Sequence, residues 1–553
     1  MPYARRRLRH EANRFVLAGG LVFGGVAGLP PTAAPAAHCA AGEHAGGEWT
    51  SLNHDLSNSR FQSAEHTIGP AQVPSLRPAW TFQVPAEAGR DGGVQSTPIV
   101  AGGCVYFTTS GQGLLATNWY EGVSEDAAFR GGVVYALNAD TGALVWKTPV
   151  NGYVLGLAAA DGLVYVLPSA APAPASLAGA AEPKGAHAVA LDGRTGKVAW
   201  VSERLDDDDP RNGGVINASP VVFTPRGAPH PILFVPMSVG GGDGARVPLH
   251  LLHAGTGRVV KRFFALSKRE YAAGYGGVGV WSTAAFDPAS GYLYAGTADS
   301  EGHTMQHRYN NAILKIDADP ARRTFGTVVD AYSGTSEHYD LDRRLPSWQD
   351  NAVCRADPTL VPNQDRSQST GCLELDLDFG SSPVLYTDSR GRRLVAELQK
   401  SGVLHAVDTE GMDAAWTQVL SGPDEAGHGA SGATDGTDLY ISTSPDLLWS
   451  FDRTAGSARW TTTTGASAMS YQPVTAANGV IYGITDLGML VAVDAHSGLA
   501  LLQRPISLDA GLRSCLGTGA GAAIARNTLY APCDAAAITT VGSPGAIVAY
   551  RPM

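Results

Sequence analysis

The sequence is poor in several residue types, and each shortage excludes a class of protein. Only 16% of its 553 residues are charged, and the 40 Lys and Arg residues are outnumbered by 51 Asp and Glu residues. The formal net charge of -11 has the wrong sign for a surface that binds nucleic acid. Beyond the N-terminus, no apolar run reaches the roughly 18 residues that a membrane-spanning helix needs. We therefore expect neither a nucleic-acid partner nor a membrane span after the N-terminal segment.

The N-terminus has the layout of a cleaved secretory signal. Five arginines between Arg5 and Arg14 precede an apolar stretch at 15–29, and small residues follow at 33–37. A twin-arginine signal matches weakly, and a membrane anchor is disfavoured because the apolar stretch is short and rich in Gly. Removing residues 1–37 takes away five Arg and one Glu, so the net charge of -11 becomes -15. The sequence predicts a secreted or extracytoplasmic, acidic protein.

Cysteine is also scarce. The six cysteines include no Cys-x-x-Cys and no Cys-x-x-Cys-His, which excludes a zinc ribbon and a covalently attached c-type haem. An even number in an exported chain favours disulfides, although six cysteines can pair in 15 ways. Closeness in sequence favours Cys354 with Cys372 and Cys515 with Cys533, which leaves Cys39 with Cys104.

The chain contains 67 Gly and 34 Pro residues, which favours many turns over long helices. A strand of alternating apolar residues, an Asp- or Asn-led turn that reaches Gly, and often a Trp recur along it, as in VVYALNADTGALVW and HAVALDGRTGKVAW. Between these copies lies a second unit of a small-residue strand, a turn and an aromatic-rich strand, such as STPIVAGGCVYFTT. The second unit occurs eight times. Each pair of units predicts a four-stranded antiparallel sheet.

The last unit is followed only by AIVAYRPM and lacks an outer strand, whereas LRPAWTFQV near the N-terminus has no partner. An N-terminal strand that completes the last blade closes a ring and removes its exposed sheet edges. The sequence therefore predicts an all-β fold, an eight-bladed β-propeller with four-stranded blades, at 49–553. A signal peptide at 1–37 and a flexible lead at 38–48 precede it. A β-sandwich explains neither the eight paired units nor the split last one.

Three features together resemble the pyrroloquinoline quinone (PQQ) dehydrogenases, with the polyvinyl-alcohol dehydrogenases as the nearest branch. They are the Asp-x-x-Thr-Gly-x-x-x-Trp repeat, the segment 48–80, and DLDFGSSPVLYTDSRGRRLVAELQKSGVLHAVD at 376–408. The resemblance covers nearly the whole mature chain. Because similar propellers also serve as scaffolds, an extracellular module that binds protein or glycan without catalysis is the alternative.

The resemblance implies residues around the quinone. Trp281, six residues before Asp287, matches the indole that forms the floor under the ring, with a core Trp as the alternative. Lys400 matches the cation that contacts the quinone oxygens, with an exposed hairpin Lys as the alternative. Gln95 lies where many relatives have an acidic residue near the quinone.

The resemblance also implies acidic residues around a metal ion, Ca2+ or a lanthanide. Asp299 replaces the usual asparagine and keeps a hard oxygen ligand, unless it caps a turn. Asp376 aligns best with the catalytic base, and Asp378 with a second acidic ligand that the family associates with lanthanides. The alternative is two solvated carboxylates on one strand face. Glu182 is the candidate for the metal-binding glutamate, with an ordinary loop Glu as the alternative.

These residues imply a secreted enzyme that oxidises a small-molecule or polymeric alcohol by hydride transfer to PQQ. Asp376 or Asp378 would remove the alcohol proton, the metal ion would polarise the quinone carbonyl, and Lys400 would stabilise charge on its oxygen. Since the sequence encodes no c-type haem site, such an enzyme would need an external electron acceptor.

Overall fold

The computed structural model describes residues 37–42, 45–85, 93–94, 96–109, 132–150, 152, 154–169, 186–206, 216–238, 246–298, 307–334, 377–421, 429–465, 472–517, 519–534 and 545–553. Regular structure there is almost entirely β-strand, with three short helical segments, η1 (Val73–Ser75), α1 (Lys268–Ala272) and α4 (Ile506–Ala510). No helix in these ranges is long and apolar enough to cross a membrane. Residues 1–36 lie outside the ranges, so the signal peptide stays a prediction.

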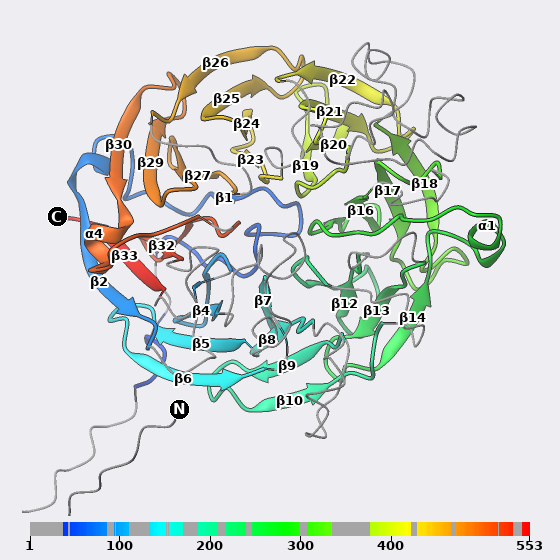
Figure 1. Ribbon diagram of the computed structural model, residues 1–553, viewed down its shortest axis with the longest axis horizontal. Helices are drawn as coiled ribbons and strands as arrows, with labels where there is room; N and C mark the ends of the chain where they lie inside the picture. Colours follow the sequence, from blue (N-terminus) through cyan, green and yellow to red (C-terminus); the bar gives the residue numbers. More distant parts are fainter. Residues whose placement is uncertain are drawn as a thin grey trace, which may run out of the picture. The chain divides into compact units, whose positions relative to one another are not determined.

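The strands form eight sheets arranged as the blades of a ring (Figure 1). In each blade the strands are antiparallel, and the first strand along the chain is the innermost, except in blade 8, where the outermost strand comes first in the chain. The strands of blades 1 to 4 are β3 (Ile99–Ala101), β4 (Cys104–Thr109), β5 (Val133–Asn138), β6 (Leu144–Pro149); β7 (Leu157–Ala160), β8 (Leu163–Val166), β9 (Val189–Asp192), β10 (Val198–Val201); β11 (Val221–Phe223), β12 (Ile232–Val235), β13 (Leu249–His253), β14 (Val259–Phe263); β15 (Ala285–Asp287), β16 (Tyr292–Gly296), β17 (Ala312–Asp317) and β18 (Val328–Ser333).

The second half of the ring repeats this pattern. In its last blade, a strand from the N-terminal part of the chain pairs with the C-terminal strand. β2 (Leu76–Gln83) pairs antiparallel with β33 (Ala546–Pro552), so an N-terminal strand completes blade 8. The predicted eight-bladed propeller and its closure are confirmed. The other strands of blades 5 to 8 are β19 (Val384–Thr387), β20 (Arg393–Leu398), β21 (Val403–Asp408), β22 (Ala414–Val419); β23 (Ala433–Thr434), β24 (Asp438–Thr443), β25 (Leu447–Asp452), β26 (Ala458–Thr463); β27 (Thr475–Ala477), β28 (Val480–Ile484), β29 (Met489–Asp494), β30 (Ala500–Pro505); β31 (Ala523–Ala525) and β32 (Thr528–Cys533).

The Trp residues of the repeat join neighbouring blades. The indole Nε1–H groups of Trp80, Trp146 and Trp200 donate to backbone oxygens of the following blade at 3.2, 2.9 and 3.0 Å. Each ring also covers the Gly of a turn in that blade, so that a Cβ on Gly142 would lie 2.5 Å from the Trp80 ring. The same docking recurs at Trp416 and Trp460. The repeat motif therefore couples the blades around the ring.

The segment 45–62 crosses the middle of the ring, which the sequence did not predict (Figure 1). Backbone N–H groups from blades 4 to 7 donate to carbonyl oxygens of this segment at 2.7–2.9 Å, and they belong to Phe286, Leu385, Thr434 and Ala476. Its last residues form β1 (Phe61–Gln62), which adds to β27 as a parallel strand. The N-terminal segment therefore ties together blades that lie far apart in sequence.

Arg60 fixes this segment to its surroundings. Its guanidinium is fully buried and donates to the carbonyl oxygens of Leu52, Val474 and Ala522 at 2.5, 2.6 and 3.1 Å, and to the Thr475 hydroxyl at 2.8 Å. Desolvation by burial lowers the pKa of Arg60 to about 9. Neutral acceptors that converge on the guanidinium therefore offset the cost of burying this cation.

The ring has two ends. Residues just before an inner strand lie at the end that we call the site end, as Trp281 lies before β15 and Asp378 before β19. The turns that follow the inner strands lie at the opposite end. The segment 45–62 bonds there, for example from the Gly46 carbonyl oxygen to the N–H of Arg526 just after β31. We call this the closed end.

One disulfide lies at each end of the ring. Cys39 is bonded to Cys104 at the start of β4, at the closed end. Cys515 is bonded to Cys533 at the end of β32, at the site end. Both predicted pairs are confirmed. The third predicted pair, Cys354 with Cys372, lies outside the described residues and stays a prediction.

Candidate active site

Three of the predicted site residues converge at the site end. The Nε1–H of Trp281 donates to Oδ2 of Asp378 at 2.9 Å, and the Lys400 ammonium lies 3.5 Å from the same oxygen. The Lys400 nitrogen is 5.2 Å from the centroid of the Trp281 ring, a cation–π distance. Asp378 and Lys400 are only 6% and 4% exposed, so water screens their attraction weakly. We call these three residues the site cluster.

A tight turn positions Lys400 between β20 and β21. The turn is closed by a hydrogen bond of 3.0 Å from the Gln399 N–H to the Val403 oxygen and by one of 2.9 Å from the Gly402 N–H to the Gln399 oxygen. Gly402 has a φ of 81°, which a residue with a Cβ rarely adopts. The Lys400 N–H also donates to the backbone oxygen of Asp378 at 2.9 Å. Backbone and side chain thus both hold Lys400 against Asp378.

The indole of Trp281 is positioned by a close approach to Gly380. A Cβ on Gly380 would lie 2.2 Å from the Trp281 ring, so any larger residue there would push the indole away. Gly380 follows Asp378 and Phe379, and the Phe379 N–H donates to the Thr297 oxygen of blade 4 at 3.1 Å. The Asp-Phe-Gly stretch therefore has a role in packing as well as in the site.

The remaining predicted site residues lie outside the described part of the chain. They are Gln95, Glu182, Asp299 and Asp376, and their roles stay predictions. Asp378 is the only predicted metal ligand within the described part of the chain. Among the described residues, no group of three or more His, Cys, Asp or Glu side chains could hold a metal ion.

Sequence reasoning missed a buried acid close to the site cluster. Glu397, in β20, is 1% exposed, and neither carboxyl oxygen has a hydrogen-bond partner among the residues that the structure describes. Gly296 leaves room for it, because a Cβ there would lie 2.1 Å from the Glu397 Oε1 and 2.6 Å from the Phe379 Cβ. Desolvation by burial raises the pKa of Glu397 well above its ordinary value, which favours the neutral acid. The sequence gives no clear signal for this burial, because residues on both faces of β20 are buried.

A neutral histidine lies opposite Glu397. His405 is the strand partner of Glu397 and is fully buried, and desolvation lowers its pKa to about 3. Its Nδ1 is 3.1 Å from the Tyr332 hydroxyl and its Nε2 is 3.3 Å from the Gln399 Oε1. A neutral imidazole that donates from Nε2 and accepts at Nδ1 fits both contacts. We call Glu397, Gln399, His405 and Tyr332 the buried polar layer.

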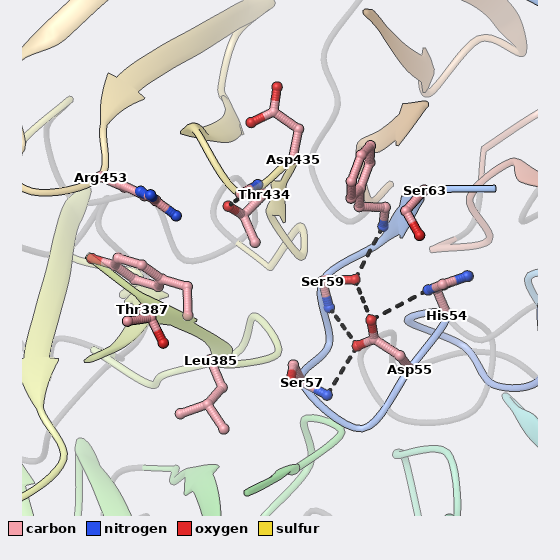
Figure 2. A pocket seen from close by; sticks show the side chains of 13 residues that line it. His54, Asp55, Ser57, Ser59, Ser63, Leu385, Thr387, Thr434, Asp435 and Arg453 are labelled. Carbon is pink, nitrogen blue, oxygen red and sulfur yellow. Dashed lines mark hydrogen bonds and ion pairs between the residues drawn. The ribbon is translucent and has the colours of Figure 1, made fainter. Parts of the chain in front are cut away.

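A hollow of 280 Å³ lies at the closed end, not at the site end (Figure 2). In it, Oδ1 of Asp55 accepts from the N–H groups of Ser57 and Ser59 at 2.9 and 3.1 Å, and Oδ2 accepts from the Ser59 hydroxyl at 2.5 Å. Although desolvation opposes the effect, hydrogen bonds from His54 and Ser59 lower the pKa of Asp55. Asp55 therefore holds the turn of the N-terminal segment in shape. We assign no chemistry to this hollow.

Comparison with known proteins shows what this chain is similar to. A family model described as outer membrane protein assembly factor BamB matches residues 126–223 and 399–551. A polyvinylalcohol dehydrogenase of a Pseudomonas species is 24% identical over 87% of this chain and 72% of its own length. A polyvinylalcohol dehydrogenase of Sphingopyxis sp. strain 113P3 is 26% identical over 75% of this chain and 59% of its own length. In sequence the chain is similar to the polyvinylalcohol dehydrogenases, and the predicted resemblance to the PQQ-dependent alcohol dehydrogenases is confirmed.

Solved structures of alcohol dehydrogenases share the fold. The quinohemoprotein alcohol dehydrogenase of Comamonas testosteroni superposes with a TM-score of 0.62 at 16% identity, covering 91% of this chain and 80% of that chain. A europium-containing methanol dehydrogenase superposes with a TM-score of 0.62 at 15% identity, covering 91% of this chain and 98% of that chain. At these identities, the likeness concerns the propeller and not the site.

Proposed function

We propose that this chain is a secreted PQQ-dependent dehydrogenase that oxidises an alcohol to a carbonyl compound. One observation carries the proposal: Trp281, Asp378 and Lys400, which the resemblance assigns to a single cofactor site, converge at the site end. They come from two blades. Trp281 is 97 residues from Asp378 in the sequence and Lys400 is 22 residues from it, so the fold brings them together. An ordinary core Trp or an exposed hairpin Lys would not need the contacts to Asp378.

The chemistry of the site cluster fits PQQ and a hard cation. Trp281 is partly exposed and offers a flat apolar face for a planar ring system. Lys400 offers an ammonium group, which suits a ligand with carboxylate and quinone oxygens. Asp378 offers oxygen ligands of the kind that Ca2+ and lanthanide ions take. When bound, PQQ supplies the acceptor for the hydride.

The residues of the chain would then orient the reactants and move the proton. Trp281 would hold the ring plane, since its indole is fixed by Asp378 at Nε1 and by Gly380 at the outer atoms of the six-membered ring. Lys400 would stabilise negative charge that develops on a quinone oxygen, and its burial strengthens this effect because water screens it weakly. Both Trp281 and Lys400 engage Oδ2 of Asp378, which fixes the direction of that carboxylate.

The contacts of Asp378 suggest different roles for Asp378 and Asp376. We assign Asp378 to anchoring Lys400 and to binding the cation, because its Oδ2 already accepts from Trp281 and lies next to the ammonium. We assign Asp376 to the removal of the alcohol proton. The predicted ligands Asp299 and Glu182 and the predicted quinone contact Gln95 complete the site in this proposal.

The substrate would be a small-molecule or polymeric alcohol. Polyvinylalcohol is the substrate named for two relatives, which makes a secondary alcohol on a polymer chain the first compound to test. Electrons would leave to an external acceptor, since the sequence has no c-type haem motif.

Activity with defined cofactors tests the proposal. The mature chain is incubated with PQQ and either Ca2+ or La3+, and oxidation of ethanol, 2-butanol and polyvinyl alcohol is followed with an artificial dye acceptor. Asp376→Asn is expected to lower turnover by about 10² to 10⁴ because it removes the base. Asp378→Asn is expected to weaken cation binding, which isothermal titration with La3+ measures.

The matched control is Asp435→Asn, at the hollow of the closed end. Asp435 is an acidic residue in the turn between β23 and β24, at the opposite end of the ring from the site cluster, and its loss should leave turnover unchanged. Equal losses in Asp376→Asn and Asp435→Asn, or no oxidation by the unmodified chain with either ion, would contradict the proposal.

A further inference from the structure

Val278 has a backbone conformation that its side chain disfavours. Its φ is 60°, in the left-handed region, where the branched Cβ of valine crowds the neighbouring carbonyl. The other non-glycine residues with positive φ in the described ranges are His, Asn, Asp, Arg or Met, none of them β-branched. Such strain persists only where the surroundings enforce it.

The surroundings of Val278 do enforce it, because both neighbouring blades hold the segment on either side. The Asn310 side chain donates to the Gly276 oxygen at 3.3 Å, and the Ala298 N–H donates to the Gly279 oxygen at 2.8 Å, both from blade 4. From blade 3, the Met237 oxygen accepts from the Val280 N–H at 2.8 Å. The backbone at 276–280 is thus fixed before it reaches Trp281.

The side chain of Val278 adds an anchor that a glycine would lack. It is 2% exposed and packs in the hydrophobic cluster between blades 3 and 4 with Val221, Phe223 and Phe286. Burial of the branched side chain stabilises the fold, whereas the left-handed conformation destabilises it. Burial and strain therefore have opposite effects on the free energy of unfolding. Both nevertheless restrict the position of the backbone at 276–280.

The position of the indole three residues later is tightly limited. A displacement toward Gly380 is blocked, since even a Cβ there would lie 2.2 Å from the ring. A displacement away lengthens the 2.9 Å hydrogen bond from Trp281 to Asp378. We propose that Val278 is a positioning residue that holds Trp281 in register with Asp378 for cofactor binding. This inference rests on the proposed function, in which Trp281 is the floor of the PQQ site.

Val278→Gly tests the inference, because glycine accepts the same φ without strain and removes the anchor. PQQ affinity is measured by equilibrium dialysis in the presence of Ca2+, and amide hydrogen exchange is measured for the peptide that covers 276–283. We expect the Kd for PQQ to rise five- to twentyfold and exchange at Val280 to become at least tenfold faster. The melting temperature should change little.

Met412→Gly is the matched control. Met412 is also a buried non-glycine residue with positive φ, 53°, but it lies in the turn between β21 and β22, where other blades have glycine. Met412→Gly should leave the PQQ affinity and exchange at 276–283 unchanged. Equal effects of the two variants on PQQ affinity would show that general loosening of the fold, and not the position of Trp281, is responsible, and would overturn the inference.

The experiments distinguish failure of the positioning role of Val278 from failure of the proposed function. If the unmodified chain binds PQQ but Val278→Gly binds it equally well, the positioning role is wrong and the proposed function stands. If the unmodified chain binds no PQQ, the proposed function fails, and hydrogen exchange still decides whether Val278 holds the Trp281 segment. Unchanged exchange in Val278→Gly would then overturn the positioning role as well.

Discussion

Arg60, in the N-terminal segment that crosses the ring, and Glu397, near the site cluster, are both almost fully buried and ionisable, but their surroundings differ. The Arg60 guanidinium reaches three backbone carbonyls and a hydroxyl. The Glu397 carboxyl has no hydrogen-bond partner among the described residues. A buried group must be matched by partners or lose its charge. The N-terminal segment keeps the buried charge of Arg60 by surrounding it with acceptors, whereas burial without partners favours the neutral form of Glu397.

This difference matches what the two regions do. Carbonyl oxygens of the N-terminal segment accept hydrogen bonds from successive blades and hold the ring together. In the site cluster, the charges of Lys400 and Asp378 are paired with each other, and burial favours the neutral forms of Glu397 and His405 nearby. A neutral layer leaves the field at the site to Lys400, Asp378 and bound ligands.

Removal of Arg60 should have the largest effect on stability. Arg60→Met keeps much of the buried volume but leaves the carbonyl oxygens of Leu52, Val474 and Ala522 without their donor. We expect the free energy of unfolding to fall by about 3–5 kcal/mol, as when one partner of a buried charged contact is removed. Urea unfolding measures it, with the exposed Arg258→Met as the control. A loss below about 1 kcal/mol would remove the distinction between Arg60 and Glu397.

The two disulfides should differ from each other in their contribution to stability by less than the effect expected for Arg60→Met. The Cys39–Cys104 bond closes 65 residues and the Cys515–Cys533 bond closes 18. On the loop-entropy account, replacing both cysteines by serine should cost about 4 kcal/mol at the closed end and about 3 kcal/mol at the site end. Urea unfolding of the two double variants checks the order. The reverse order would show that chain entropy does not set these contributions.

Neutralising Glu397 should stabilise the protein, by a smaller amount. Since the folded state raises the pKa of Glu397, it binds more protons than the unfolded state above the ordinary value of 4.5. Stability is therefore lost as pH rises from 4.5 toward the folded pKa. Glu397→Gln removes this loss, so at pH 7 the variant should be more stable by about 1–3 kcal/mol.

At pH 4 the unmodified protein and Glu397→Gln should unfold at the same urea concentration, because the carboxyl is then protonated in both states. The exposed Glu203→Gln is the control and should show no such difference between pH 4 and pH 7. A Glu397→Gln variant that is less stable at pH 7 would mean that the carboxyl is ionised and paired in the folded protein.

The repeat made the fold predictable, since it defines each blade from a few dozen neighbouring residues. The ring closure was predictable too, because GAAIARNTLYAPC lacks an outer strand that LRPAWTFQV provides. The course of the segment 45–62 was not, as several of its partners are backbone N–H groups more than 200 residues away, for example those of Phe286 and Leu385. Backbone hydrogen bonds leave no trace in the sequence.

The site was predictable only where the resemblance supplied it. Trp281 and Lys400 are ordinary residues until the fold brings them to Asp378. Glu397 looks like a solvent-facing strand residue from its type, and its burial depends on the glycine at 296 in the neighbouring blade. The strain at Val278 depends on hydrogen bonds from two blades.

The most direct test of the central claim is where PQQ binds. Equilibrium dialysis of PQQ in the presence of Ca2+ or La3+ compares the unmodified chain with Lys400→Met at the site end and Arg453→Met at the hollow of the closed end. We predict one PQQ per chain, a Kd raised at least tenfold by Lys400→Met, and no change with Arg453→Met. Binding that survives Lys400→Met but is lost with Arg453→Met, or no binding by the unmodified chain with either ion, would contradict the account.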